Sequence, residues 1–390
     1  MALDGLSPLH LATALVALDG QVAAMLLLPS ALEESKRQAL IEAAGCSHYL
    51  TADGLQPLTS AVPVTSKGPL TQWLLTTSGT TGTPKLIGHT LHSLIHSCKR
   101  DPQRGAGYVW GLLYDPARFA GLQVLLQALL AGSRLVLVSG LPQEQQVEFL
   151  LAQRVNAMSA TPSLWRRLLM DDRLAGLPLR QITLGGEIAD AVILQALRKR
   201  FVQARLVHIY ASTEAGTGFA VKDGLPGFPA KWLAGAEGVP LLRVSAKGHL
   251  LLKPSVLTEG DEIARRLDAE GFLDSGDLVE QQGQRVLFLG RAGGAINVGG
   301  NKVNPEAVEA FLRSIDGVLD ARVSGRSNSM MGQLVVAEVV PVAGVDTAHL
   351  RQEIHRKCRA GLEKWQAPGL VNFVERLLET AAGKRERTQP

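Results

Sequence analysis

The stretch from residue 74 to residue 85 reads Leu74-Leu75-Thr76-Thr77-Ser78-Gly79-Thr80-Thr81-Gly82-Thr83-Pro84-Lys85. A short apolar segment runs into a loop of two glycines and many hydroxyl groups, and the loop ends in a lysine. Glycines let backbone N–H groups face a ligand, hydroxyls donate hydrogen bonds and Lys85 adds positive charge, which together suit a polyphosphate. The loop lacks the Gly-Lys-Ser/Thr ending of a Walker A motif, and taken alone such a loop is more often a linker.

Apolar segments of strand length alternate with amphipathic segments of helix length around this loop. The expected strands are 22–28, 47–51, 135–138, 157–160, 181–184 and 206–209. The expected helices are 31–44, 143–151 and 162–170. Alternation of this kind predicts an α/β domain with much parallel sheet.

The pattern changes after about residue 222, where short strands such as 248–253 and 286–289 predict a β-rich subdomain. The glycine-rich segment 290–294 then predicts a hinge. Beyond it we expect a compact α+β unit with a helix at 305–314, a strand at 334–340 and a helix capped by Asp346. That last helix carries an apolar stripe of Leu350, Ile354, Cys358 and Leu362. We therefore expect a core at 1–289 and a small mobile domain at 290–390.

Composition limits the class of protein. The chain has 390 residues, of which 46% are hydrophobic and 19% charged, as in a soluble globular protein with room for two domains. Its net charge is only +4, and no block of Lys and Arg is interleaved with aromatic residues. We therefore expect no nucleic-acid partner.

The cysteines and the N-terminus indicate the compartment. Cys46, Cys98 and Cys358 are three in number and lack CxxC spacing, which argues against a disulfide framework or a zinc ribbon. Asp4 stands where a signal peptide would carry a basic residue. The apolar run 9–28 is interrupted at residues 19–21, which predicts a helix and a buried strand and no membrane span. A reducing cytoplasm is the expected location.

The order of residues in 77–85 closely resembles the phosphate loop of the ANL superfamily of adenylating enzymes, which includes acyl-CoA synthetases, nonribosomal-peptide adenylation domains and luciferase. Further motifs of that superfamily follow in the same order from about residue 15 to the C-terminus. They are Gly185-Gly186-Glu187, Tyr210-Ala211-Ser212-Thr213-Glu214, Ser275-Gly276-Asp277, Gly290-Arg291 with the following segment 296–306, and Gly383-Lys384.

The resemblance implies an ATP- and Mg²⁺-dependent ligase that forms an acyl-AMP and passes the acyl group to a thiol. The acceptor would be CoA or the pantetheine arm of an acyl or peptidyl carrier protein. It implies catalytic roles for Lys384, Thr213 and Glu214. The nucleotide site would comprise Thr77, Ser78, Gly79, Thr80, Thr81, Gly82, Lys85, Gly185, Gly186, Glu187, Tyr210, Ala211, Ser212, Asp277 and Arg291.

Each implied role suits the side chain. Tyr210 offers a flat face to adenine, and Thr213 can bond an α-phosphate oxygen. Glu214 can hold magnesium, a hard cation that prefers carboxylate and phosphate oxygens. Asp277 can accept hydrogen bonds from both ribose hydroxyls, and Arg291 can reach the same sugar.

The chain departs from the superfamily pattern in two places. The phosphate loop begins unusually early, so the resemblance implies a shortened N-terminal domain. The usual acidic hinge residue falls on Gly293 or Gly294. Glycine widens the accessible backbone range, so we expect the C-terminal domain to rotate between the two chemical steps.

The acyl pocket is predicted at Arg118, Phe119 and Gly121. Phe119 falls where amino-acid activators carry an Asp for the α-amine, which predicts a non-amino acid, either aryl or of modest chain length. Asp115 lies close enough to replace that Asp, so an amino-acid-activating enzyme stays an alternative. Arg118 is either a partner for a second carboxylate of the substrate or a solvated surface residue.

Two further interpretations remain. His89, His92 and His96, near Cys98, have spacings that suggest one helical face, but they lack the ligand count of a metal site. The second interpretation is a degenerate paralogue that binds nucleotide without turnover. The joint presence of Lys384, Glu214 and Asp277 argues against such a paralogue, and pyrophosphate release on mixing acids with ATP would distinguish it from a ligase.

We predict that Lys384→Ala leaves ATP binding nearly intact and lowers the adenylation rate by several orders of magnitude. Its ammonium would meet the negative charge that builds on the α-phosphoryl oxygens, and one such donor is worth about 2.7–4 kcal/mol. ATP–pyrophosphate exchange measures this rate. A variant that keeps more than half of it would show that Lys384 has another role.

Overall fold

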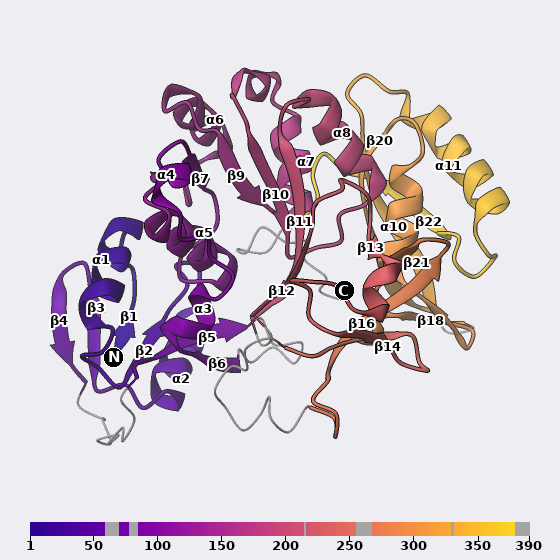
Figure 1. Ribbon diagram of the computed structural model, residues 1–390. Coiled ribbons are helices and arrows are strands. Elements are labelled where there is room, and N and C mark those ends of the chain that lie inside the picture. The colour runs from indigo at the N-terminus through magenta and orange to yellow at the C-terminus, as the bar shows by residue number, and fades with distance from the viewer. Residues whose placement is uncertain (59–69, 78–84, 214–215, 255–266, 329–330, 379–390) are drawn as a thin grey trace.

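The computed structural model describes residues 1–58, 70–77, 85–213, 216–254, 267–328 and 331–378. Three sheets form the large N-terminal part, and a fourth forms the smaller C-terminal domain, drawn in orange and yellow in Figure 1. This mixed α/β architecture, in which the region of the third sheet consists mainly of strands, confirms the predicted fold class. Within the described residues, no helix is long and apolar enough to cross a membrane.

The first sheet, sheet A, contains the strand that leads into the phosphate loop. Its strands in spatial order are β4 (Gly54–Pro57), β3 (His48–Thr51), β1 (Ala2–Leu3), β2 (Ala24–Leu27), β5 (Gln72–Thr77) and β6 (Lys85–His89). Alternate side chains face opposite sides because the strand period is two. Leu3 packs toward α1 (Pro8–Leu18), whereas Ala2 packs toward α2 (Glu34–Ala43).

The second sheet, sheet B, is parallel except at one edge. Its order is β12 (Gly216–Val221), β11 (Arg205–Ser212), β10 (Gln181–Gly185), β9 (Ala157–Ala160), β7 (Val109–Leu112) and β8 (Arg134–Leu137), with only β12 antiparallel to its neighbour. The helices of this region are α5 (Phe119–Leu130), α6 (Gln143–Ala152), α7 (Pro162–Leu169) and α8 (Ala191–Arg200). Trp165 on α7 is fully buried in its core.

The third sheet, sheet C, is wholly antiparallel. Its order is β13 (Phe228–Pro229), β17 (Arg285–Arg291), β16 (Leu273–Gln282), β15 (His249–Leu252) and β14 (Leu242–Val244). Phe228 and Val286 fill its core. This sheet confirms the β-rich subdomain that the sequence predicts after residue 222.

The fourth sheet, sheet D, belongs to the C-terminal domain. It consists of β19 (Asn301–Val303), β18 (Ile296–Val298), β21 (Gly332–Pro341) and β20 (Val318–Asn328), with β22 (Leu370–Phe373) parallel to β21. Its core also takes in α10 (Pro305–Arg313) and α11 (Thr347–Gly361). Asp346 caps α11 through the Ala348 N–H, as predicted. Leu362 lies one residue past the helix but still packs on the core.

Short helical turns complete the described chain. They are α3 (Leu91–Ile95), α4 (Pro102–Gly105), η1 (Asp172–Gly176), η2 (Ala230–Ala234) and η3 (Ala292–Gly294). Two of the three glycines of the predicted hinge, Gly293 and Gly294, lie in η3, while the third, Gly290, has φ +133°. A Cβ at Gly290 would lie 2.3 Å from the Glu306 carboxylate, so α10 approaches this backbone closely.

Helix α5 joins sheets A and B, because Leu122 packs in the core of the first and Val124 in that of the second. The preceding loop, residues 113–118, folds back onto the first turn of this helix. A Cβ on Gly121 would lie 2.1 Å from the Asp115 carbonyl oxygen. Glycine at this position therefore sets the position of the loop.

We predict that Gly121→Ala lowers the free energy of unfolding by about 1–3 kcal/mol, since the new methyl group must displace rigid backbone. Chemical denaturation measures this loss. Gly293→Ala is the matched control, because a Cβ there meets nothing within 4 Å. Equal stability of the two variants would contradict the close approach.

Candidate active site

Four parallel strands of sheet B, β7, β9, β10 and β11, have their carboxyl ends on the same side of the sheet. The segments that follow them are 113–118, 161–163, 186–190 and Thr213. Ligands of open α/β sheets bind beside these carboxyl ends. Two of the predicted motifs, at 185–187 and 210–213, reach these ends.

The phosphate loop connects two antiparallel strands. Thr77 ends β5 and lies directly opposite Lys85, the first residue of β6. Lys85 is exposed. Ser78, Gly79, Thr80, Thr81 and Gly82 lie outside the described residues. Their role in binding phosphate stays a prediction, and so do those of Thr77 and Lys85.

His89 joins the phosphate-loop hairpin to the motif after β11. Its ring is buried, and Nε2 lies 2.8 Å from the carbonyl oxygen of Thr213. A carbonyl can only accept, so Nε2 carries the proton. The Nδ1 atom lies 3.4 Å from Ser93 Oγ. This contact fixes the backbone of a predicted catalytic residue.

The predicted helical face of three histidines is wrong for His89, which ends strand β6, whereas α3 begins only at Leu91. Thr90 starts that helix because its hydroxyl accepts the Ser93 N–H. His96 is the C-cap of the short helix. No cluster of three metal-ligating side chains occurs among the residues that the structure describes.

Asp277 is bonded to two other residues of the predicted nucleotide site, Tyr210 and Arg291. The Tyr210 hydroxyl donates to Asp277 Oδ2 at 2.6 Å, and Arg291 Nε lies 2.9 Å from Oδ1. Asp277 and Arg291 are paired directly across β16 and β17, which accounts for the ion pair. Burial and the negative charge of Asp277 raise the pKa of Tyr210, so its hydroxyl stays a proton donor.

An aromatic stack that the sequence did not reveal holds the Tyr210 ring. Phe219 and Phe288 lie with centroids 5.1 and 5.2 Å from it, at interplanar angles of 17° and 10°. Phe219 comes from β12, the neighbour of β11, and Phe288 from sheet C. The stack therefore fixes the ring plane at the junction of sheets B and C. The predicted contact of the Tyr210 ring with adenine is untested.

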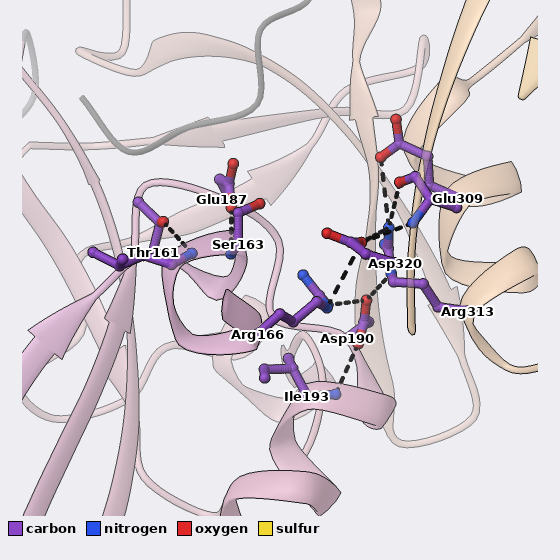
Figure 2. A network of polar contacts seen from close by, with 11 residues as sticks. Thr161, Ser163, Arg166, Glu187, Asp190, Ile193, Glu309, Arg313 and Asp320 are labelled. Carbon is purple, nitrogen blue, oxygen red and sulfur yellow. Dashed lines mark hydrogen bonds and ion pairs between the residues drawn. The ribbon is translucent and has the colours of Figure 1, made fainter. Parts of the chain in front are cut away.

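Glu187, in the segment predicted to lie along adenine, points toward helix α7. Its carboxylate accepts the Ser163 N–H at 2.9 Å, as Figure 2 shows. Thr161 caps the same helix by accepting the Leu164 N–H. A carboxylate is favourable at the positive end of a helix. The side chain thus anchors the segment that contains Gly185 and Gly186, whose contacts with nucleotide stay predicted.

The predicted acyl pocket begins with a tightly bonded loop. Asp115 Oδ2 accepts the N–H and the hydroxyl of Ser30, and Oδ1 accepts the Ala117 N–H. Asp115 therefore shapes the loop with both of its oxygens.

The Phe119 ring, in the same predicted pocket, lies 5.7 Å from the ring of His89, which places Phe119 beside Thr213.

Arg118 is the unusual residue of this loop. Its Nε is buried and has no hydrogen-bond partner in the described part of the chain. Burial lowers the pKa of Arg118, and the nearby Asp115 charge opposes that shift. A guanidinium nevertheless stays protonated. An unpaired buried donor is costly, which favours an anionic ligand here.

Four predicted site residues remain, and two of them lie outside the described part of the chain. Ala211 and Ser212 end strand β11, where a register shift follows Tyr210. Glu214 and Lys384 lie outside the described residues. Their predicted roles with magnesium and the α-phosphate are therefore untested by the geometry.

Comparison with known proteins agrees with these motifs. A family model described as AMP-binding enzyme matches residues 12–247, and one described as AMP-binding enzyme C-terminal domain matches residues 307–384. The chain belongs to the AMP-binding enzyme family. The resemblance to the ANL superfamily is thereby confirmed.

Relatives in the AMP-binding family include named CoA ligases. A 2-succinylbenzoate–CoA ligase of Listeria innocua is 26% identical over 328 residues, covering 80% of this chain and 68% of that protein. A probable 2-succinylbenzoate–CoA ligase of Mycobacterium tuberculosis is 30% identical over 340 residues, covering 80% of this chain and 82% of that protein.

Solved AMP-binding structures share the fold. The o-succinylbenzoate CoA synthetase MenE of Bacillus subtilis, solved with its acyl-adenylate intermediate, gives a TM-score of 0.72 at 20% identity and covers 98% of this chain and 86% of that one. The anthranilate CoA ligase AuaEII, solved with anthranoyl-AMP, gives 0.76 at 16% identity, covering 98% and 85%.

We predict that His89→Leu lowers kcat/KM for ATP in pyrophosphate exchange by about tenfold, because the Thr213 carbonyl loses its donor. His89→Gln restores an N–H near the Nε2 position and should recover part of the activity. Exposed His92→Gln is the matched control and should retain full activity. Wild-type activity in His89→Leu would exclude a positioning role for this histidine.

Proposed function

We propose that this chain is an ATP-dependent ligase that activates a carboxylic acid as acyl-AMP and transfers the acyl group to CoA. The observation that carries the proposal is the meeting of Tyr210, Asp277 and Arg291 beside the ends of the parallel strands of sheet B. These residues come from three separate motifs of one superfamily. The CoA ligases among the relatives support the same reaction.

The described residues fit ATP. Asp277 accepts a hydrogen bond from Tyr210 and pairs with Arg291, and we infer that the same carboxylate also accepts the ribose hydroxyls. MenE of Bacillus subtilis has been solved with ATP and a magnesium ion. Here Glu214 would hold magnesium, which would balance the charge of the phosphates.

The chain's own groups would then act in order. Thr213, held by His89, would bond an α-phosphate oxygen, and Lys384 would stabilise the charge that develops there as the substrate carboxylate displaces pyrophosphate. The acceptor thiol would next attack the acyl carbon and release AMP. We place the domain boundary at 289/290, next to the close approach of Gly290 to α10. The domain after it would change orientation between the steps.

The pocket favours an acid without an α-amine and with a second anionic group. Phe119 supplies no charge for an ammonium, and the bonds of Asp115 to Ser30 and Ala117 hold that carboxylate in the loop. Arg118 would bring a guanidinium charge to an anion, and its Nε has no hydrogen-bond partner among the described residues. 2-Succinylbenzoate, named for several relatives, carries two carboxylates and matches these requirements.

Two alternatives to a CoA ligase can each be tested by a different experiment. A carrier-protein pantetheine arm would replace CoA as the acceptor, and thioester formation with each thiol separates the two. A degenerate paralogue would bind ATP without releasing pyrophosphate in the presence of any acid.

We predict that ATP–pyrophosphate exchange over a panel of acids selects a dicarboxylic aryl acid over its monocarboxylic analogue and over α-amino acids. Arg118→Gln should lower kcat/KM for the dicarboxylic acid at least about tenfold, the loss of one charged hydrogen bond, and change the monocarboxylic analogue by no more than about threefold.

Arg118→Lys is the matched control, since it keeps the charge and loses the planar fork. Unfolding midpoints should show that all the variants remain folded. Equal losses for both acids would assign Arg118 to loop structure. An α-amino acid as the best substrate would favour the amino-acid-activating alternative.

A further inference from the structure

Five charged side chains meet between the large N-terminal part and the C-terminal domain (Figure 2). Arg166 lies on α7 and Asp190 caps α8, whereas the others belong to the C-terminal domain: Glu309 and Arg313 on α10, and Asp320 on β20. Arg166, Asp190 and Arg313 are 7%, 8% and 7% exposed, and Glu309 is 1% exposed. Charged groups are rarely buried unless paired.

Asp190 is the centre of this charge junction. Its Oδ2 lies 2.7 Å from an Arg166 guanidinium nitrogen and 2.8 Å from Arg313 Nε, while Oδ1 accepts the Ile193 N–H at the start of α8. Burial alone would raise the pKa of Asp190, but the charges of Arg313 and Arg166 outweigh it and lower that pKa. One carboxylate thus joins both parts of the chain.

The C-terminal domain holds Arg313 in position from its own side. Arg313 donates to the Ala321 carbonyl at 3.2 Å, and one of its nitrogens lies 3.8 Å from Glu309 and 3.7 Å from Asp320. Glu309 is itself fixed, because it accepts the Val323 N–H. The guanidinium is therefore pre-oriented for Asp190.

The junction is also connected to the candidate nucleotide site. Asp190 follows Glu187 by three residues, and Arg166 follows Ser163 by three residues on α7. Glu187 and Ser163 are hydrogen-bonded to each other. A change at Asp190 or Arg166 would therefore reach the predicted adenine segment through two short chain segments.

The cores on the two sides are separate. The hydrophobic cluster around Trp165 and the cluster around Val339 share no residue. Separating an interface of charges returns those charges to water, which offsets much of the loss of pairing. Such an interface suits a contact that forms and breaks during a reaction cycle.

We infer that Asp190 and Arg313 are positioning residues that hold the C-terminal domain in one orientation of the catalytic cycle. This inference rests on the proposed function. Without Arg313, the docked state would lose the ion pair that joins Asp190 to α10, while Arg166 would keep its contacts with Asp190 and Asp320. In the separated state Asp190 would face water in place of α10.

The kinetic test compares two half-reactions in Arg313→Gln. One is ATP–pyrophosphate exchange, and the other is transfer from preformed acyl-AMP to CoA. We expect the ratio of the two rates to change at least tenfold. A ratio within threefold of wild type would overturn the inference, whether both rates fall together or neither falls.

Arg322→Gln is the matched control. Arg322 lies 2.7 Å from Glu338 within sheet D, so its loss breaks an ion pair inside the C-terminal domain. This variant should keep the wild-type ratio. A change in the ratio as large as that of Arg313→Gln would assign the effect to domain stability and overturn the inference.

Small-angle scattering of the full chain without substrates separates this inference from the proposed function. Arg313→Gln should show larger overall dimensions than wild type, and Arg322→Gln should not. Asp190→Asn combined with Arg313→Gln should add little to the single variant, because both remove the same contact. Unchanged scattering would overturn the junction even in an active ligase, whereas absent exchange in wild type would overturn the ligase alone.

Discussion

Parallel strands bring their carboxyl ends to one edge of a sheet, and the candidate site depends on that constraint in sheet B. Each strand delivers one short segment to this edge, and the segments are held there by long-range bonds. His89 bonds to Thr213 from sheet A, and Asp277 binds Tyr210 from sheet C. Three sheets therefore contribute to one site, and none of them contains it alone.

Local patterns were sufficient to predict much of the fold. Strand β9 begins and ends where the sequence places it, and α11 is capped by Asp346 as expected. Hydrophobic period and capping residues act over a few positions, so they can be read directly from the chain. The motif residues Asp277 and Arg291 also come together as the resemblance implies.

Contacts between distant residues were not predictable in the same way. The sequence suggested a helical face for His89, yet this residue ends a strand and its partner lies 124 positions away. The bonds of Asp115 to Ser30 and Ala117 also depend on how the loop folds, so its surroundings could not be predicted from the sequence. The pairing of Asp190 with Arg313 has no local pattern, because neither residue type nor spacing marks its partner.

The burial of the charge junction has a consequence for its dependence on heat. Hydration of charged groups carries a strongly negative entropy, so water solvates separated ions less favourably as temperature rises. The contact of Asp190 with Arg313 should therefore hold better, relative to its separated form, in a warm cell than in a cold one. An apolar contact also weakens on cooling, but its strength levels off on heating. Cold would thus loosen this domain contact by making water a better solvent for its ions.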